Sequence, residues 1–129
     1  MKQEFRLTKE QQDYFEKGIT LYNKGAFFES HEEWEVLWNL FSDSNRLYFQ
    51  ALIQLASGYL KLEEKVFGGA YKHFLKSQEK LKQFPDSFLK VNNREIKTKL
   101  ADAIKEIESL GEKADSEALL DARPTIVVE

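Results

Sequence analysis

The sequence LYFQALIQLASGYL, residues 47–60, decides the fold of this chain. It contains no Asp, Glu, Lys or Arg. At about 100° per residue, its apolar side chains cover more than half of a helical wheel, which is typical of a helix packed among other helices. The polar residues 42–45 precede it and include good N-cap residues. We therefore predict a central helix over residues 46–63.

Helical patterns continue on both sides of this segment. Thr8 and Gln11 resemble a capping box, and Gly25 is expected to end the first helix. Gly18 lies within the apolar face of that helix, where it permits close approach of a neighbour. The second helix is predicted at about 27–41. A fourth helix follows a break at Gly68 and Gly69 and is ended by Pro85, and a fifth runs from Asn92–Asn93 to Gly111. The tail over 112–129 is expected to be partly irregular, with an extended end.

The length and composition predict one all-α domain over residues 1–129. The chain has 129 residues, of which 42% are hydrophobic and 13% aromatic. A chain of this length buries roughly two-thirds of its unfolded surface in a single core. Prolines are few and strand-like alternation is nearly absent. We predict a bundle of about five main helices in which the helix at 46–63 is surrounded by the others.

Several function classes are disfavoured by the sequence. The absence of cysteine removes disulfides, thiolate metal ligands and cysteine nucleophiles. The polar N-terminal segment lacks the apolar core of a signal peptide, and no apolar run approaches the ~20 residues of a membrane span. We expect a cytoplasmic protein with no membrane partner.

The charge is unevenly distributed along the chain. The net charge is −3, which disfavours general binding to nucleic acid. Residues 25–45 contain five acidic and no basic residues, whereas residues 61–100 contain ten basic and five acidic residues. We expect the acidic helix to pack near basic ones, and we expect no nucleic-acid partner.

The segment FFESHEEWEVLW, residues 27–38, places a histidine among aromatic residues. At helical spacing, His31 shares the apolar face with Phe27 and Trp38, and Glu35 follows one turn later. A buried imidazole needs hydrogen-bond partners for both ring nitrogens. Glu35, at i+4, is the expected first partner of His31.

The helix at 46–63 has one polar stripe, which runs from Arg46 to Lys61. Its middle consists of uncharged side chains, which predicts a polar but partly buried surface. A short connector implies an antiparallel hairpin, in which Gln54 and Ser57 lie opposite His31. We predict one polar cluster or pocket that contains His31, Glu35, Gln50, Gln54 and Ser57, walled by Trp34, Trp38 and Tyr59.

Two motifs resemble a known family. FESHEEWE at 28–35, with Trp38 after it, and QALIQLA at 50–56 look like the domain-of-unknown-function family 309 (DUF309). The resemblance covers residues 12–84 and implies a small all-helical protein without an established activity. Some relatives carry a provisional label of metal-dependent hydrolase. The connector at 42–45 is short for the family. The positions that the resemblance singles out are Glu29, His31, Glu32, Glu35, Trp38, Gln50 and Gln54.

Two functions remain open from the sequence. In the first, the polar cluster fixes the packing of a scaffold or forms the binding site of a module for a small molecule or a protein. In the second, a metal-dependent hydrolase uses His31 and Glu35 as ligands of a divalent metal, with Glu32 or Glu29 as additional ligands. Zinc sites use several His or Cys ligands, so the second function favours a carboxylate-rich site or a homo-oligomer that pools ligands. His73 is predicted to be a surface residue beside Lys76 and Lys80.

Overall fold

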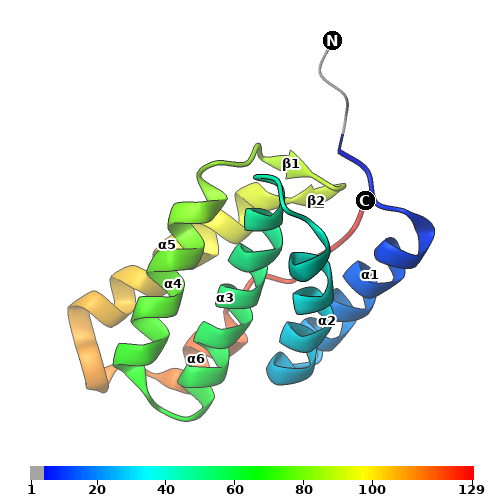
Figure 1. Cartoon of the computed structure of the whole chain (residues 1–129). Coiled ribbons are helices and arrows are strands. Elements are labelled where there is room, and N and C mark those ends of the chain that lie inside the picture. The colour runs from blue at the N-terminus through cyan, green and yellow to red at the C-terminus, as the bar shows by residue number, and fades with distance from the viewer. Residues whose placement is uncertain (1–4) are drawn as a thin grey trace.

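The computed structural model describes residues 5–129, which form a helical protein with one small hairpin (Figure 1). The predicted all-α class is confirmed. The elements are α1 (Lys9–Asn23), α2 (Phe27–Leu40), α3 (Arg46–Glu63), α4 (Phe67–Leu81), β1 (Ser87–Phe88), β2 (Val91–Asn92), α5 (Asn93–Leu110), the 3-10 turn η1 (Gly111–Lys113) and α6 (Ser116–Asp121).

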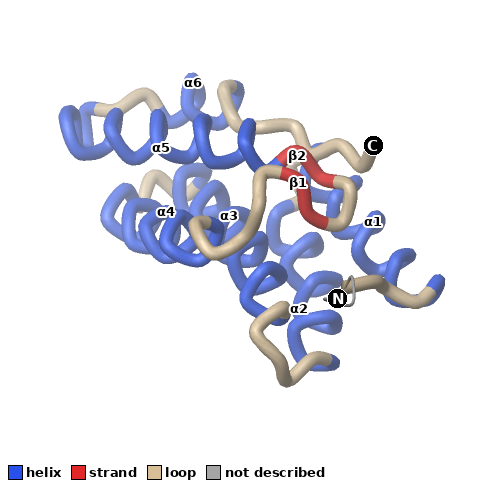
Figure 2. The backbone as a smooth tube through the Cα atoms, turned by 90° about the horizontal axis from the view of Figure 1, so that it is seen from above, coloured by secondary structure: helices blue, strands red, loops and turns tan. Residues whose placement is uncertain are grey.

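The predicted central helix is α3, with the predicted bounds. It packs between α2 and α4, and these three helices lie side by side in Figure 1. α1 packs on α2, and α5 packs on α4. Figure 2 shows α5 and α6 on one side of the α2–α3–α4 row, whereas no described helix covers the other side. The central helix is therefore enclosed by its neighbours except along one side.

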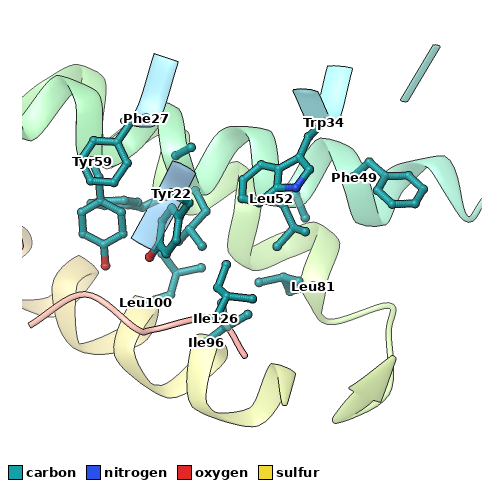
Figure 3. Close-up of a cluster of buried hydrophobic side chains, with 14 of the residues drawn as sticks. Tyr22, Phe27, Trp34, Phe49, Leu52, Tyr59, Leu81, Ile96, Leu100 and Ile126 are labelled. Atoms are coloured by element: carbon teal, nitrogen blue, oxygen red, sulfur yellow. The ribbon is translucent and has the colours of Figure 1, made fainter. Parts of the chain in front are cut away.

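The core joins aromatic and aliphatic side chains from all the main helices (Figure 3). Trp34 and Tyr59 are almost completely buried within it. Gly18 lets the indole of Trp34 occupy the space of an absent Cβ, and Gly58 does the same for the ring of Phe74. Both contacts bring neighbouring helices close together, as predicted for Gly18.

The helix ends agree with the sequence signals in most places. Thr8 and Gln11 form a complete capping box, and Gly25 follows α1 with a φ of 85°. The prediction that Gly68 and Gly69 break the chain is wrong, because both lie in the first turn of α4. The break instead comes at Lys65, which has a φ of 59°. Glycine in the first turn is tolerated there because the first N–H groups of a helix need no partner within the helix.

The hairpin of β1 and β2 was not predicted. Its strands have two residues each, too few to show an alternating pattern. Leu89 and Lys90 connect them, both with positive φ, as in a two-residue hairpin turn. The end of the chain is extended, as expected, and Val128 forms an isolated bridge with Val91.

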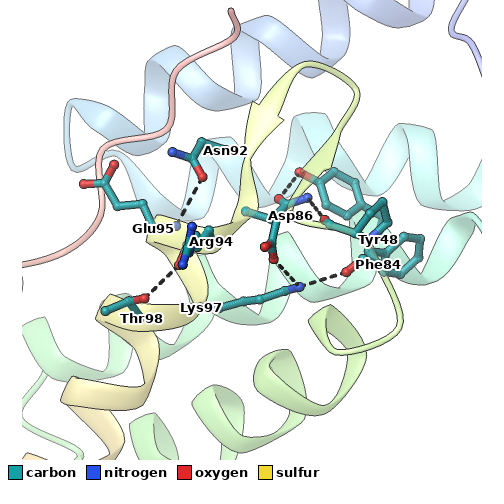
Figure 4. Close-up of polar contacts among 10 residues, drawn as sticks. Tyr48, Phe84, Asp86, Asn92, Arg94, Glu95, Lys97 and Thr98 are labelled. Atoms are coloured by element: carbon teal, nitrogen blue, oxygen red, sulfur yellow. Dashed lines mark hydrogen bonds and ion pairs between the residues drawn. The ribbon is translucent and has the colours of Figure 1, made fainter.

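Polar side chains attach the second half of the chain to the first. The Tyr48 hydroxyl donates to Oδ1 of the buried Asn93 at 2.8 Å, and Nδ2 of Asn93 donates to the Pro85 carbonyl at 3.0 Å. Lys97 donates to the Phe84 carbonyl at 2.8 Å, as Figure 4 shows. In the tail, the Pro124 carbonyl accepts from the Tyr22 hydroxyl at 2.9 Å. These bonds hold α5 and the tail against one side of the core. The opposite side of α3 is not covered by any of the described helices.

None of the helices within residues 5–129 has the length and hydrophobicity that a membrane crossing requires.

Candidate functional site

The uncovered side of α3 and the adjoining sides of α2 and α4 form one surface, which we call the three-helix polar face. Three observations identify this face. His31 pairs with Glu35 on α2, and Arg46 of α3 contacts Trp38 of α2. His73 on α4 interacts electrostatically with groups of both other helices. Its members are His31, Glu35 and Trp38 of α2, Arg46, Gln50, Gln54, Ser57 and Lys61 of α3, and His73, Lys76 and Lys80 of α4.

His31 lies at the rim of this face. Its Nε2 atom is 3.3 Å from Oε2 of Glu35, and the two side chains are 30% and 45% exposed. The pairing with Glu35 follows the predicted i, i+4 spacing. The exposed ring of Phe28 lies edge-on to the imidazole, with 6.1 Å between ring centroids. His31 is therefore partly buried and open to a ligand on one side.

His73 is the residue that the sequence analysis missed. It was predicted to be a surface residue, but its Nδ1 atom is buried and has no hydrogen-bond partner. Burial lowers its pKa, and electrostatic interactions with Lys76, Lys61 and His31 lower it further. The pKa of His73 therefore responds to groups on both α2 and α3, namely His31 and Lys61.

The register of α3 and α4 explains this position. The Ser77 hydroxyl donates to the Ala51 carbonyl at 2.7 Å, and Phe74 fills the space at Gly58. These contacts set His73 level with the polar stripe near Ser57. The short connector between α3 and α4 could have predicted this position. Folding the chain back on itself at residue 65 places positions 57 and 73 opposite each other.

Trp38 and Arg46 form the other end of the face. The guanidinium carbon of Arg46 lies 4.5 Å from the centroid of the Trp38 ring. The Nε1 atom of Trp38 and the Nε atom of Arg46 are both buried without a hydrogen-bond partner. Both atoms are donors, so this end of the face offers two N–H groups that no acceptor within the described chain satisfies.

The predicted network around His31 is incomplete. The Oε1 atom of Gln54 is buried without a partner, and no hydrogen bond within residues 5–129 joins Gln50 or Gln54 to His31. The prediction of a polar, partly buried stripe holds for the burial of these side chains. Glu35 was expected to be the first partner of the imidazole and the stripe of α3 to supply the second; the first contact is present, and no hydrogen bond from the stripe to His31 is found within residues 5–129.

Two of the predicted walls lie elsewhere. Trp34 is fully buried, and its Nε1 atom donates to the Phe15 carbonyl of α1 at 3.2 Å. Tyr59 packs against Phe27 and Phe74 and lines a cavity on the side of α5 and α6. Contacts with Phe15 of α1 and with Phe74 of α4 hold these two rings in the core. Trp38 is the one predicted wall that stays at the face.

Cavities are found at other places in the structure. One of about 960 Å³ lies beside residues 5–16, and one of about 250 Å³ lies between α3, α5 and α6. His31, Glu35, Gln50 and Gln54 line neither of them. The predicted pocket at His31 therefore gains no support from these cavities, and the candidate site is a face.

The acidic residues of α2 do not converge on a metal site. Glu29 and Glu32 are exposed, and Glu33 forms an ion pair with Lys17 of α1 at 3.3 Å. Within residues 5–129, no three His, Cys, Asp or Glu side chains are placed to hold a metal ion together. A catalytic zinc site usually has three protein ligands, and His31 with Glu35 supplies two.

The sequence of this region has a match among protein families. Residues 15–73 match the family described as Domain of unknown function (DUF309). This segment is therefore similar to the DUF309 family. The match confirms the resemblance found in the sequence over the part of the chain from α1 to the first half of α4. No curated protein matches the chain.

The segment that matches the family contains most of the three-helix polar face. It includes the pair of His31 and Glu35, the contact of Trp38 with Arg46, and His73, and it ends before Lys76. The α5 layer and the tail lie outside it. The family description assigns no activity, so the function must be argued from the geometry of the face.

Proposed function

We propose that this chain is a binding module whose three-helix polar face recognises a ligand with a carboxylate or phosphate group. The observation that carries the proposal is the pair of buried N–H donors without acceptors at Trp38 and Arg46, together with the buried Nδ1 atom of His73, which also has no partner within the described residues. A buried polar atom without a partner costs roughly 1–3 kcal/mol, and an oxyanion of a ligand would remove that cost. Arginine is the side chain best suited to such groups, because its N–H groups match two oxygens at once.

The charge of the face supports an anionic ligand. The members of the face include Arg46, Lys61, Lys76 and Lys80 against the one carboxylate of Glu35, and Lys61 also forms an ion pair with the neighbouring Glu64 at 3.3 Å. Burial lowers the pKa of Lys80, the neighbouring Glu79 opposes this shift, and the positive charge of Lys76 adds to it. Clustered positive charge at a partly desolvated surface attracts anions and orients them on approach. The free acceptor of Gln54 would take a hydrogen bond from a hydroxyl or amide of the same ligand.

Calorimetric titration of the full chain tests this proposal. The probes are inorganic phosphate, succinate and hexaglutamate, which present the same oxyanion chemistry as a free phosphate, a small carboxylate and an acidic peptide. We expect saturable binding of at least one probe. Arg46→Gln should weaken it tenfold or more, because a hydrogen bond to a charged group contributes about 1.5–3 kcal/mol.

Arg94→Gln is the matched control. Arg94 is an exposed arginine of α5 outside the face, so its replacement removes the same charge without touching the candidate site. We expect this variant to bind as the wild type does. Equal loss in the two variants would mean that binding follows net charge alone, and the absence of binding by all three probes would refute the proposal.

A further inference from the structure

A second site lies on the other side of α3, in the cavity of about 250 Å³ between α3, α5 and α6. It shares no residue with the three-helix polar face. Its lining combines three alanines and Leu119 with polar groups. The polar groups are Tyr59, Lys99, Asp102, Glu106 and Asp115.

Tyr59 supplies an unpartnered hydroxyl to this cavity. The residue is 1% exposed, and its ring packs against Phe74 with 4.9 Å between centroids. Its hydroxyl has no hydrogen bond within residues 5–129, unlike the hydroxyls of Tyr22 and Tyr48. Figure 3 shows it pointing away from the ring of Phe27, toward the side of α5 and α6. A phenol in this position offers one acceptor and one donor to whatever enters the cavity.

The rim of the cavity is acidic. Asp102 and Glu106 are four residues apart on α5, so both point to the same side of the helix. Neither forms an ion pair within the described chain. Asp115 accepts from the Ala118 N–H at 3.1 Å as the N-cap of α6. With Lys99 as the one cation among the lining residues, the cavity has an excess of negative charge.

The nearby Arg123 does not line this cavity, although its charge partly offsets the rise that burial causes in the pKa of Tyr59. Its guanidinium donates to the Leu120 carbonyl at 2.8 Å and to the Asn23 carbonyl at 2.9 Å. It also lies over the ring of Phe27, 5.3 Å from the centroid. These contacts hold Arg123 in the layer between α1 and the tail, and it does not line the cavity.

We propose that this cavity binds a small aliphatic amine. The ammonium group would donate to the Tyr59 hydroxyl and to the carboxylates of Asp102 and Glu106. The hydrocarbon part would lie against Leu119 and the alanines. At ~30 Å³ for each water-sized unit, the volume admits about eight non-hydrogen atoms, which fits a short alkyl chain with one or two amines.

The experiment is a calorimetric titration of the full chain with 1,4-diaminobutane, compared with 1,4-butanediol. The diol has the same length and no charge. We expect saturable binding of the diamine and none of the diol. Tyr59→Phe should weaken binding tenfold or more, since it removes a hydrogen bond to a charged group. Asp102→Asn should weaken it up to about fivefold, as expected of an exposed ion pair.

The control is Asp121→Asn, which removes an exposed carboxylate of α6 that does not line the cavity. It should bind as the wild type does. Tyr59→Phe should unfold at the wild-type urea concentration, because the lost hydroxyl has no partner in the protein. The proposal is overturned if the diamine does not bind, if the diol binds equally well, or if Tyr59→Phe binds the diamine unchanged. None of these results bears on the three-helix polar face, whose ligands are anions.

Discussion

The indole of Trp34 occupies the space that a Cβ at Gly18 would fill. This contact joins α1 to α2 at the point where the indole Nε1 atom donates to the Phe15 carbonyl at 3.2 Å. A large side chain of one helix thus fits against the backbone of the next. The position of Trp34 also separates the two tryptophans of α2: one fixes the packing with α1, and the other remains at the three-helix polar face.

Gly18→Ala is expected to destabilise the protein. Alanine favours a helix over glycine by about 1 kcal/mol. Here the added methyl group overlaps a fully buried indole, and overpacking costs typically 1–3 kcal/mol beyond that gain. Urea unfolding measures the difference. Gly68→Ala is the control, since nothing lies within 4 Å of the Cβ that it adds, and its stability should equal or exceed that of the wild type. A Gly18→Ala protein as stable as Gly68→Ala would contradict the packing described here.

Tyr48→Phe should lower the free energy of unfolding by about 1–3 kcal/mol, because it leaves a buried amide oxygen of Asn93 without its donor. Tyr71→Phe is the control. It removes the same atom from an exposed hydrogen bond with Glu108, so its effect should be within about 0.5 kcal/mol. Thermal or urea unfolding of both variants gives the comparison. Equal effects would show that the bond to Asn93 is no more important than a surface contact.

The stability of the protein should fall in mild acid through His73. Its pKa is lowered in the folded state, first by burial and then by Lys76, Lys61 and His31. The unfolded state, with a pKa near ~6.5, therefore binds the proton first as the pH falls. The contribution of neutral His73 to the free energy of unfolding is fully present above that pH and is lost progressively below it. His73→Gln should reduce the slope of stability against pH between about 6.5 and 5. Identical slopes for the wild type and this variant would contradict the burial of His73.

Gln54→Met separates a structural role of the polar stripe from a binding role. The Gln54 oxygen has no partner in the protein, so an apolar side chain of similar size should leave the stability unchanged or raise it. If Gln54 belonged to a satisfied network, the same change would cost about 1–3 kcal/mol. The measurement is the urea midpoint of the variant against that of the wild type, together with its affinity for the anionic probes, which we expect to be weaker.

The sequence predicted the helical framework well. The uncharged run at 47–60 identified α3, and local signals such as Thr8 and Gly25 marked the helix ends. These features are local, so one sequence is enough to see them. The break predicted at Gly68 and Gly69 is wrong, since the sequence alone does not distinguish a glycine pair in the first turn of a helix from a glycine pair in a loop.

The site was predicted less completely, because it depends on three helices at once. His31, Glu35 and the amides of α3 were found from the spacing within one hairpin. His73 comes from α4, and its position depends on the register that Ser77 and Phe74 set with α3. Trp34 and Trp38 are four residues apart, yet only the packing of α1 shows that the first belongs to the core. Helical spacing shows to which side of its helix a side chain points. Which element lies on that side depends on the whole fold.

The most direct test of the central claim follows the side-chain N–H signals by NMR while inorganic phosphate, succinate or hexaglutamate is added. The account predicts that the indole N–H of Trp38 and the Nε–H of Arg46 shift in a saturable manner with the ligand that binds. The indole N–H of Trp34, bonded to the Phe15 carbonyl, should stay in place as an internal control. If the signals of Trp38 and Arg46 remain unchanged while residues elsewhere shift, or if no signal shifts with any of the three, the three-helix polar face is not the binding site for oxyanions.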